Sequence, residues 1–254
     1  MKIVICCYLR NEMPFFPYFL RHYSTFADKI VIYDDGSDDG TVDAAKANSL
    51  VELRAYPKGN SQTSQFDDIA MVQFASSEYR RFKDYDWLMW PDADELIYHP
   101  DMRGELGRQL EAGADVIAPI GYNMQSDHFP TTDGQVYDEV FMGTHDGFCS
   151  KPVVCRPSVD HKGWSPGKHA LARIVPGFKI VLGHTIVPSM KLLHFRWLGR
   201  EYWELRNARN LSRFSPQQHG TGYGPHVAYK DYTGYGSQRM HLDAVAHLVE
   251  VLKT

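Results

Sequence analysis

The sequence predicts an α/β fold: a Rossmann-like, mostly parallel sheet flanked by helices, with a smaller mixed C-terminal part. Two observations predict this class. Short apolar segments alternate with segments of helical periodicity through the first 120 residues, and acidic residues directly follow two of the apolar segments. Sheets of this kind bind ligands where the carboxyl ends of their strands open into a crevice. We therefore expect the functional residues at that edge of the sheet.

The elements of the first half follow in a regular series. The apolar segments that predict strands are 3–9, 29–33, 51–56, 86–96 and 115–120. The segments that predict the intervening helices are 14–26, 41–48, 65–82 and 102–111. With 254 residues, of which 43% are hydrophobic, the chain can bury one large domain or one domain with a C-terminal extension.

Two acidic groups end predicted strands. Asp34 and Asp35 follow the second strand, and Asp92, Asp94 and Glu95 lie at the end of the fourth. Acids clustered where a buried strand ends are costly unless a cation or a ligand neutralises them. Mg²⁺ and Mn²⁺ prefer carboxylate oxygens and often bridge a protein to a diphosphate. Each group alone could be a capped or solvated turn, but both together in one α/β unit favour a site for a metal and a phosphate.

Three motifs resemble a known family. They are residues 10–12 (Arg-Asn-Glu), 34–41 (Asp-Asp-Gly-Ser-Asp-Asp-Gly-Thr) and 92–95 (Asp-Ala-Asp-Glu), in this order after the first, second and fourth strands. Together they resemble the nucleotide-sugar signature of family 2 glycosyltransferases with the GT-A fold, over the first 120 residues and more loosely to about residue 215. The donor-binding residues implied by this resemblance are Arg10, Asn11, Glu12, Asp34 and Asp35, with Asp34 or Asp35 on the nucleoside.

The resemblance also implies a metal site for Mn²⁺ or Mg²⁺ on the donor diphosphate. Asp92 and Asp94 would form its DXD element, and GT-A enzymes commonly complete the metal shell with a later histidine. His194, in the apolar run 190–197, is the preferred ligand, and His169 would share the shell or contact the diphosphate. A histidine within such a run can instead be a hydrogen-bonded core residue.

An inverting transfer, as is normal in that family, needs a carboxylate to take the proton of the acceptor hydroxyl. The polar segment 121–147 follows the fifth strand and is expected to border the acceptor. Its candidate bases are Asp127, Asp133, Asp138, Glu139 and Asp146. We prefer Asp127 because it lies soonest after the strand, although a solvated loop acid is an alternative for each of them.

Beyond residue 147 the pattern is weaker. A strand is predicted over 151–156, and a helix over 199–214 whose charges mostly predict a solvated face, with Arg200 or Arg206 on the leaving diphosphate as the alternative. Residues 215–237 predict a lid-like loop and 239–252 a terminal amphipathic helix. The expected domains are a GT-A domain over 1–214, divided into a nucleotide-sugar half (1–120) and an acceptor and metal-completing half (121–214), and an extension over 215–254.

Composition narrows the function classes. The formal net charge of −4 and the pI near 6.3 give no basic field for nucleic acid. The four cysteines show no zinc or disulfide spacing, which favours a cytoplasmic setting, and no apolar run is long enough to span a membrane. A place at the inner face of the membrane, with peripheral contact, stays open, as does the oligomeric state.

The sequence therefore predicts a metal-dependent glycosyltransferase of bacterial surface glycan synthesis, with a nucleotide-sugar donor, UDP-sugar first, and a glycan or lipid-linked hydroxyl acceptor. One alternative is a sugar-phosphate nucleotidyltransferase, although the first strand is not followed by a glycine-rich basic phosphate loop. The other is a non-catalytic carbohydrate-binding protein with the same fold.

Overall fold

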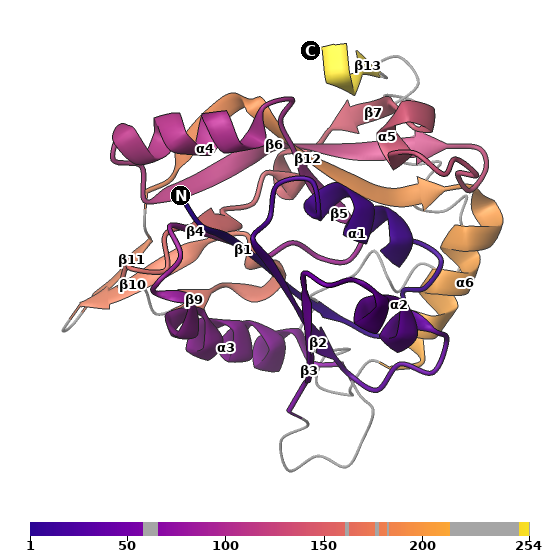
Figure 1. Cartoon of the computed structure of the whole chain (residues 1–254), viewed down its shortest axis with the longest axis horizontal. Helices are drawn as coiled ribbons and strands as arrows, with labels where there is room; N and C mark the ends of the chain where they lie inside the picture. Colours follow the sequence, from indigo (N-terminus) through magenta and orange to yellow (C-terminus); the bar gives the residue numbers. More distant parts are fainter. Residues whose placement is uncertain (58–65, 161–162, 176–177, 182, 214–248, 254) are drawn as a thin grey trace.

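The computed structural model describes residues 1–57, 66–160, 163–175, 178–181, 183–213 and 249–253, and its main element is a ten-stranded sheet (Figure 1). The order along it is β13-β7-β6-β8-β4-β1-β2-β3, and β12 pairs with both β5 and β6. The strands of this sheet are β1 (Ile3–Leu9), β2 (Lys29–Asp34), β3 (Val51–Ala55), β4 (Trp87–Met89), β5 (Glu95–Tyr98), β6 (Val116–Ser126), β7 (Met142–His145), β8 (Val154–Cys155), β12 (Thr185–Leu198) and β13 (Val249–Glu250).

Helices pack on both faces of this sheet. The α-helices are α1 (Phe16–Tyr23), α2 (Thr41–Ala47), α3 (Asp68–Glu78), α4 (Met102–Glu111), α5 (Val136–Glu139) and α6 (Arg200–Leu211). The 3₁₀ turns are η1 (Tyr79–Phe82), η2 (Gly147–Cys149), η3 (Pro166–Lys168) and η6 (Val251–Lys253). A second sheet is formed by three strands, β9 (Gly163–Trp164), β10 (Leu171–Val175) and β11 (Phe178–Val181), and it shares a buried core cluster with the first through Trp164 and Leu171. No helix in the described ranges is long and apolar enough to cross a membrane.

The predicted α/β class is confirmed, with the parallel pairing concentrated in the N-terminal half. β3, β2, β1 and β4 are parallel neighbours, and β6 runs parallel to β12. The pairings of β5, β7, β8 and β13 are antiparallel. Leu9 lies beside Asp34 in the register of β1 and β2, so the loops after both strands leave the sheet at one edge.

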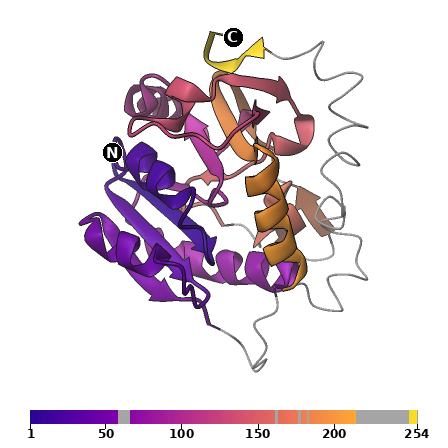
Figure 2. The same ribbon diagram turned by 90° about the vertical axis from the view of Figure 1, so that its right-hand side faces the viewer.

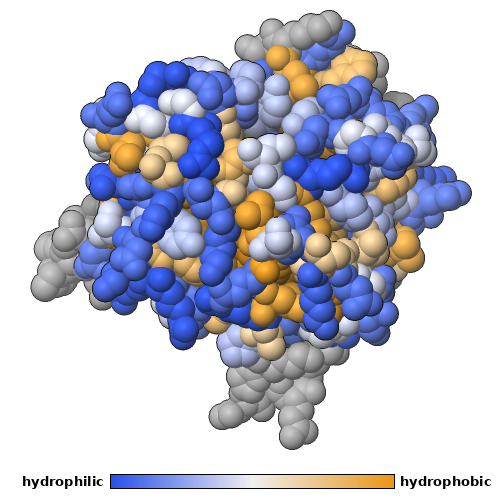
Figure 3. Space-filling model, in the orientation of Figure 1, coloured by the Kyte–Doolittle hydropathy of each residue, from blue (hydrophilic) through white to orange (hydrophobic). Residues whose placement is uncertain are grey.

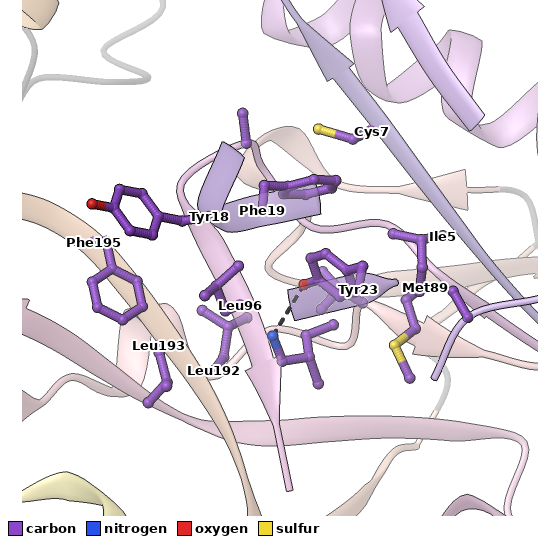
Figure 4. Close-up of a cluster of buried hydrophobic side chains, with 14 of the residues drawn as sticks. Ile5, Cys7, Tyr18, Phe19, Tyr23, Met89, Leu96, Leu192, Leu193 and Phe195 are labelled. Atoms are coloured by element: carbon purple, nitrogen blue, oxygen red, sulfur yellow. Dashed lines mark hydrogen bonds between the residues drawn. The ribbon is translucent and has the colours of Figure 1, made fainter. Parts of the chain in front are cut away.

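Alternation along β1 divides the core between the two faces of the sheet. Ile3, Ile5 and Cys7 belong to one buried cluster with α1 and α4, whereas Val4 and Cys6 belong to a second cluster with α3. Figure 4 shows the first cluster, where the Tyr23 hydroxyl accepts a hydrogen bond from the Ile97 amide at 3.0 Å. The Tyr23 hydroxyl is thus paired within this apolar core.

Several predicted boundaries need correction. The single strand expected over 86–96 is two strands, β4 and β5, because the chain turns at Pro91 and the acids after it. The polar loop expected over 121–147 contains the end of β6, α5 and β7. The loop expected over 215–237 lies outside the described residues, as does the terminal helix up to residue 248, and residues 249–253 form β13 and η6.

The outer surface is mixed. On the face in Figure 3 hydrophilic side chains dominate, with hydrophobic ones in a band near the centre. The large apolar side chains exposed in the described ranges are scattered through the sequence: Met1, Phe141, Phe148, Ile186 and Leu205. Single exposed apolar residues are normal on a protein surface, so they define no site by themselves.

Candidate functional site

The loops after β1 and β2 form one hydrogen-bonded unit. The Asn11 amide donates to the Ser37 hydroxyl at 2.8 Å, and its side chain donates to Asp38 at 2.7 Å. The Glu12 amide donates to the Thr41 hydroxyl at 3.1 Å. Asn11 holds a left-handed backbone, with φ of 55°, which asparagine tolerates better than most residues. The first two predicted motifs are therefore held together in space.

Asp34 and Asp35 have different surroundings. The Asp34 carboxylate accepts hydrogen bonds from the amides of Gly36 and Ser37, so it shapes the turn. Asp35 is buried, accepts a hydrogen bond from the Tyr8 hydroxyl at 2.8 Å and pairs with Arg213. The Tyr8 ring lies 4.7 Å from that of Tyr56. Of the two predicted nucleoside contacts, Asp35 is the one beside aromatic rings.

Asp94 is buried between two basic side chains. Its Oδ2 atom lies 2.7 Å from an Arg206 nitrogen and 3.2 Å from Nε2 of His194. Burial acts to raise the pKa of Asp94, but Arg206 and His194 outweigh it and hold that pKa well below its usual value. Burial likewise acts to lower the pKa of His194, yet Asp94 raises it to about 10. Each of these two groups thus favours the charged form of the other.

Asp92 faces two lysines. Lys168 Nζ binds one of its carboxylate oxygens, and Lys151 Nζ lies 3.3 Å from the other. Lys151 also contacts the buried Glu95 at 2.5 Å. The two lysine side chains are 1% and 10% exposed, whereas that of Asp92 is 42% exposed. Burial acts to raise the pKa of Asp92, but the two lysines outweigh it and hold that pKa far below its usual value.

The backbone at Lys168 is unusual. Gly167 has φ of 66° and Lys168 has φ of 60°, so two successive residues of η3 are left-handed. The Gly167 amide donates to the Asp68 side chain at 2.8 Å, which holds this turn against α3. A left-handed residue other than glycine is strained and persists only where its surroundings impose it. This strained turn positions the Lys168 ammonium group against Asp92.

Three arginines, two on α6 and one just after it, reach the acidic motifs. Arg206 contacts Asp94, Arg209 lies 2.8 Å from Glu12, and Arg213, just after the helix, pairs with Asp35. Figure 2 shows the full length of α6 in orange. The prediction of a mostly solvated face was wrong for these arginines, because they form ion pairs with buried carboxylates. Their spacing of three and four residues was the signal that could have revealed a common face.

A solvated pair remains on the same helix. Arg200 and Glu204, four residues apart, are 2.7 Å from each other, with side chains 63% and 47% exposed. This part of α6 agrees with the predicted solvated face. Arg200 was the alternative to Arg206 as a diphosphate contact, and it is Arg206 that reaches the acidic motifs.

The predicted metal ligands do not form one donor set. Asp94 and His194 meet, but Asp92 is bound by lysines, and His169 is exposed with its ring 6.1 Å from that of Phe148. Within the described ranges no three His, Cys, Asp or Glu side chains are grouped to hold a metal ion. A metal ligand must be a carboxylate or imidazole that is free to bind the ion, whereas Asp92 is paired with Lys168 and Lys151, and Asp94 with Arg206 and His194. The residues as arranged do not fit Mn²⁺ or Mg²⁺.

The predicted base lies apart from these pairs. The Asp127 side chain is 94% exposed and forms a hydrogen bond with His128, whose neighbourhood lowers the pKa of Asp127. Asp146 is partly buried and accepts a hydrogen bond from Asn123 at 2.8 Å. Asn123 in turn contacts His194 at 2.9 Å, so Asp146 is linked to Asp94 through two side chains.

The other candidate bases have local roles or no described contact. Glu139 accepts hydrogen bonds from the amides of Thr131 and Thr132, and Asp138 caps the start of α5. These bonds hold the loop before α5 together. Asp133 lies in the same loop and is exposed.

Comparison with known proteins gives similarity of fold alone. No family model matches the sequence, and no curated protein matches it. Among solved structures, Staphylococcus aureus TarS 1–349 in complex with UDP-GlcNAc is 11% identical, with a TM-score of 0.47, over 97% of this chain and 78% of that one. In another crystal structure of TarS 1–349, the match covers 62% of this chain and 48% of that one, at 14% identity and a TM-score of 0.40.

Two further structures are synthases. Mannosyl-3-phosphoglycerate synthase from Rubrobacter xylanophilus is 19% identical, with a TM-score of 0.35, over 48% of this chain and 40% of that one. Glucosyl-3-phosphoglycerate synthase from Mycobacterium tuberculosis, with Mn²⁺, UDP and glucosyl-3-phosphoglycerate, is 18% identical, with a TM-score of 0.33, over 47% of this chain and 44% of that one. The chain thus spans less than half of the length of these two proteins.

Proposed function

We propose that this protein is a glycosyltransferase that moves a sugar from a nucleotide-diphosphate-sugar to a hydroxyl acceptor. One observation carries the proposal: the motifs after β1, β2 and β4 are brought together, because Arg206 and Arg209 of α6 contact Asp94 and Glu12, and Arg213 just after the helix contacts Asp35. In an α/β sheet this edge is where a ligand binds. The same three motifs carry the resemblance to family 2 glycosyltransferases.

Different residues of the site would bind different parts of the nucleotide-sugar donor. Asp35 and the Tyr8 and Tyr56 rings would receive the nucleoside, by hydrogen bonding and stacking. Arg10 is a further candidate contact, since its Nη1 atom is buried and meets no hydrogen-bond partner among the described residues. Buried hydrogen-bond donors are normally paired, so the Nη1 atom of Arg10 supports a contact with a bound ligand at this position.

The transfer itself would be a displacement at the anomeric carbon. The acceptor oxygen forms a bond to that carbon while the bond from carbon to phosphate oxygen breaks and its electron pair leaves with the nucleoside diphosphate. The acceptor proton passes to a carboxylate, for which we propose Asp127, with Asp146 as the alternative. Inversion, a UDP-sugar donor, a glycan or lipid-linked acceptor and a role in surface glycan synthesis are the parts of this proposal that the family resemblance supplies.

The first test is thermal stability of the purified chain with UDP, GDP, CDP, ADP and dTDP and their sugar conjugates, each with and without Mn²⁺. A ligand that binds the folded state alone raises the unfolding temperature by mass action. A shift confined to one base supports the donor site, and slow hydrolysis of that sugar conjugate supports transfer. Absence of any shift in folded protein would contradict the proposal and favour a binding protein without the chemistry.

The base is tested separately with Asp127→Asn and Asp146→Asn. Loss of a positioned general base lowers the rate by about 10²–10⁴-fold and leaves donor binding unchanged. We expect this result for Asp127→Asn, measured as sugar transfer or donor hydrolysis at saturating donor. If Asp127→Asn keeps the wild-type rate and Asp146→Asn loses it, the base is Asp146.

A further inference from the structure

We propose that Lys151 and Lys168 form a binding site for the donor diphosphate and take the place of the predicted divalent cation. This inference rests on the proposed function, because it names the groups that hold the diphosphate of that donor. It departs from the sequence prediction of Mn²⁺ or Mg²⁺ at Asp92 and Asp94.

The two ammonium groups are buried and converge on one carboxylate. Lys168 is 1% exposed and Lys151 is 8% exposed, and each binds a different oxygen of Asp92. Lysine is rarely buried to this extent, because removing an ammonium ion from water is costly. Two of them side by side make a compact receptor for an oxyanion with several oxygens.

The backbone is strained at the residue that supplies one of these ammonium groups, Lys168. Lys168 is left-handed directly after the left-handed Gly167, and Asp68 on α3 holds the turn. Such outliers are concentrated at sites where a side chain must be held in one position. A lysine that only balanced surface charge would not need this backbone.

Charge and exposure indicate how an anion can enter. Among these three side chains Asp92 is the one open to solvent, at 42% exposure, so it can turn outward while the buried lysines stay in place. The positions that its two oxygens leave, beside Lys168 and Lys151, are where diphosphate oxygens would bind. Near it, Glu95 and Asp94 already have Lys151 and Arg206 as partners, so little negative charge is left to attract a divalent cation. The ammonium groups would stabilise the charge that grows on the departing diphosphate.

The test is calorimetric titration of the full chain, treated with EDTA, with inorganic pyrophosphate and with UDP. We expect binding without metal, and in Lys168→Met an affinity for pyrophosphate lower by about 10- to 100-fold, since one charged hydrogen-bond donor is lost. Lys83→Met removes the same charge from an exposed position and should bind as wild type does. Because Asp92 is half-exposed, Lys168→Met leaves no buried acid unpaired, and circular dichroism checks its fold.

Asp92→Asn separates the two models of the site. If the lysines hold the diphosphate, removing their carboxylate partner leaves pyrophosphate binding as tight as in wild type or tighter. If Asp92 holds a metal, the same variant loses binding, and wild type binds UDP in Mn²⁺ and not in EDTA. That second result overturns this inference and leaves the proposed function standing. Failure of all nucleoside diphosphates to bind, with or without Mn²⁺, overturns both.

Discussion

Asp94 and Asp127, the two acids on which the predicted chemistry depended, have opposite surroundings. Asp94 follows β4, is 2% exposed and lies between Arg206 and His194. Asp127 follows β6, is 94% exposed and has His128 as its hydrogen-bond partner. Both come after strands in the sequence, and both were singled out for the same reason. The position of an acid after a strand therefore predicts that it lies at the end of that strand, whereas its partners decide whether it is buried or exposed.

The difference indicates how firmly each acid is held. A buried carboxylate survives in a folded protein when basic partners offset its desolvation, so the surroundings of Asp94 are interdependent. An exposed carboxylate is solvated in the folded and unfolded states alike, so Asp127 needs no basic partner to offset desolvation. A buried electrostatic centre and a separate, solvent-exposed acid are what a displacement with its own base would need.

The largest effect is expected for Asp94→Ala. It leaves Arg206 and His194 buried without their shared carboxylate, and breaking a buried pair in this way costs about 3–5 kcal/mol. The free energy of unfolding from urea titration measures it, and nucleoside diphosphate binding should fall together with stability. A wild-type free energy of unfolding would show that this pair does not contribute to the fold.

A smaller effect is expected for Arg206→Met, because Asp94 keeps His194 as a partner. The free energy of unfolding should fall by about 3 kcal/mol. Arg200→Met is the matched control on the same helix, since its exposed pair with Glu204 is worth about 0.3–0.5 kcal/mol. Equal losses in the two variants would contradict the distinction between the inner and outer faces of α6.

The smallest effect on stability is expected for Asp127→Ala, whose unfolding midpoint should equal that of wild type. The partner of Asp127 gives a pH test. Asp127 and Glu139 raise the pKa of His128, so any stabilisation by this pair is complete below the usual histidine pKa and is lost as pH rises through the raised value. Thermal melts of Asp127→Ala and wild type across that range should nearly coincide, and a clear gap at low pH alone would show that the pair is structural.

Local pattern predicted the elements well where periodicity and capping agree. The helix expected over 102–111 is α4, with the Asp101 side chain capping its first turn, and the strand expected over 3–9 is β1. The strand expected over 86–96 was too long, because the acidic turn after Pro91 interrupts it. Apolar runs alone do not show where a chain leaves the sheet.

Part of the site was also predictable. Glu12, Asp35, Asp94 and His194 were named from motifs and resemblance, and the structure gives each a buried or partly buried place with basic or polar partners. His169 and Asp92 do not join them in one metal shell. Lys151 and Lys168 were not predicted as diphosphate contacts, because an isolated lysine in a loop has the same local pattern whether it is buried or solvated.

The sequence by itself determined the α/β class, the order of its first elements and the acidic motifs after the strands, because these depend on the periodicity and residue types of nearby positions. The tertiary structure alone decided which charges meet. Lys168 is 76 residues from Asp92, and Arg213 is 178 residues from Asp35. The strength of an ion pair depends on burial and on a few ångströms of separation, which are set when distant segments pack together.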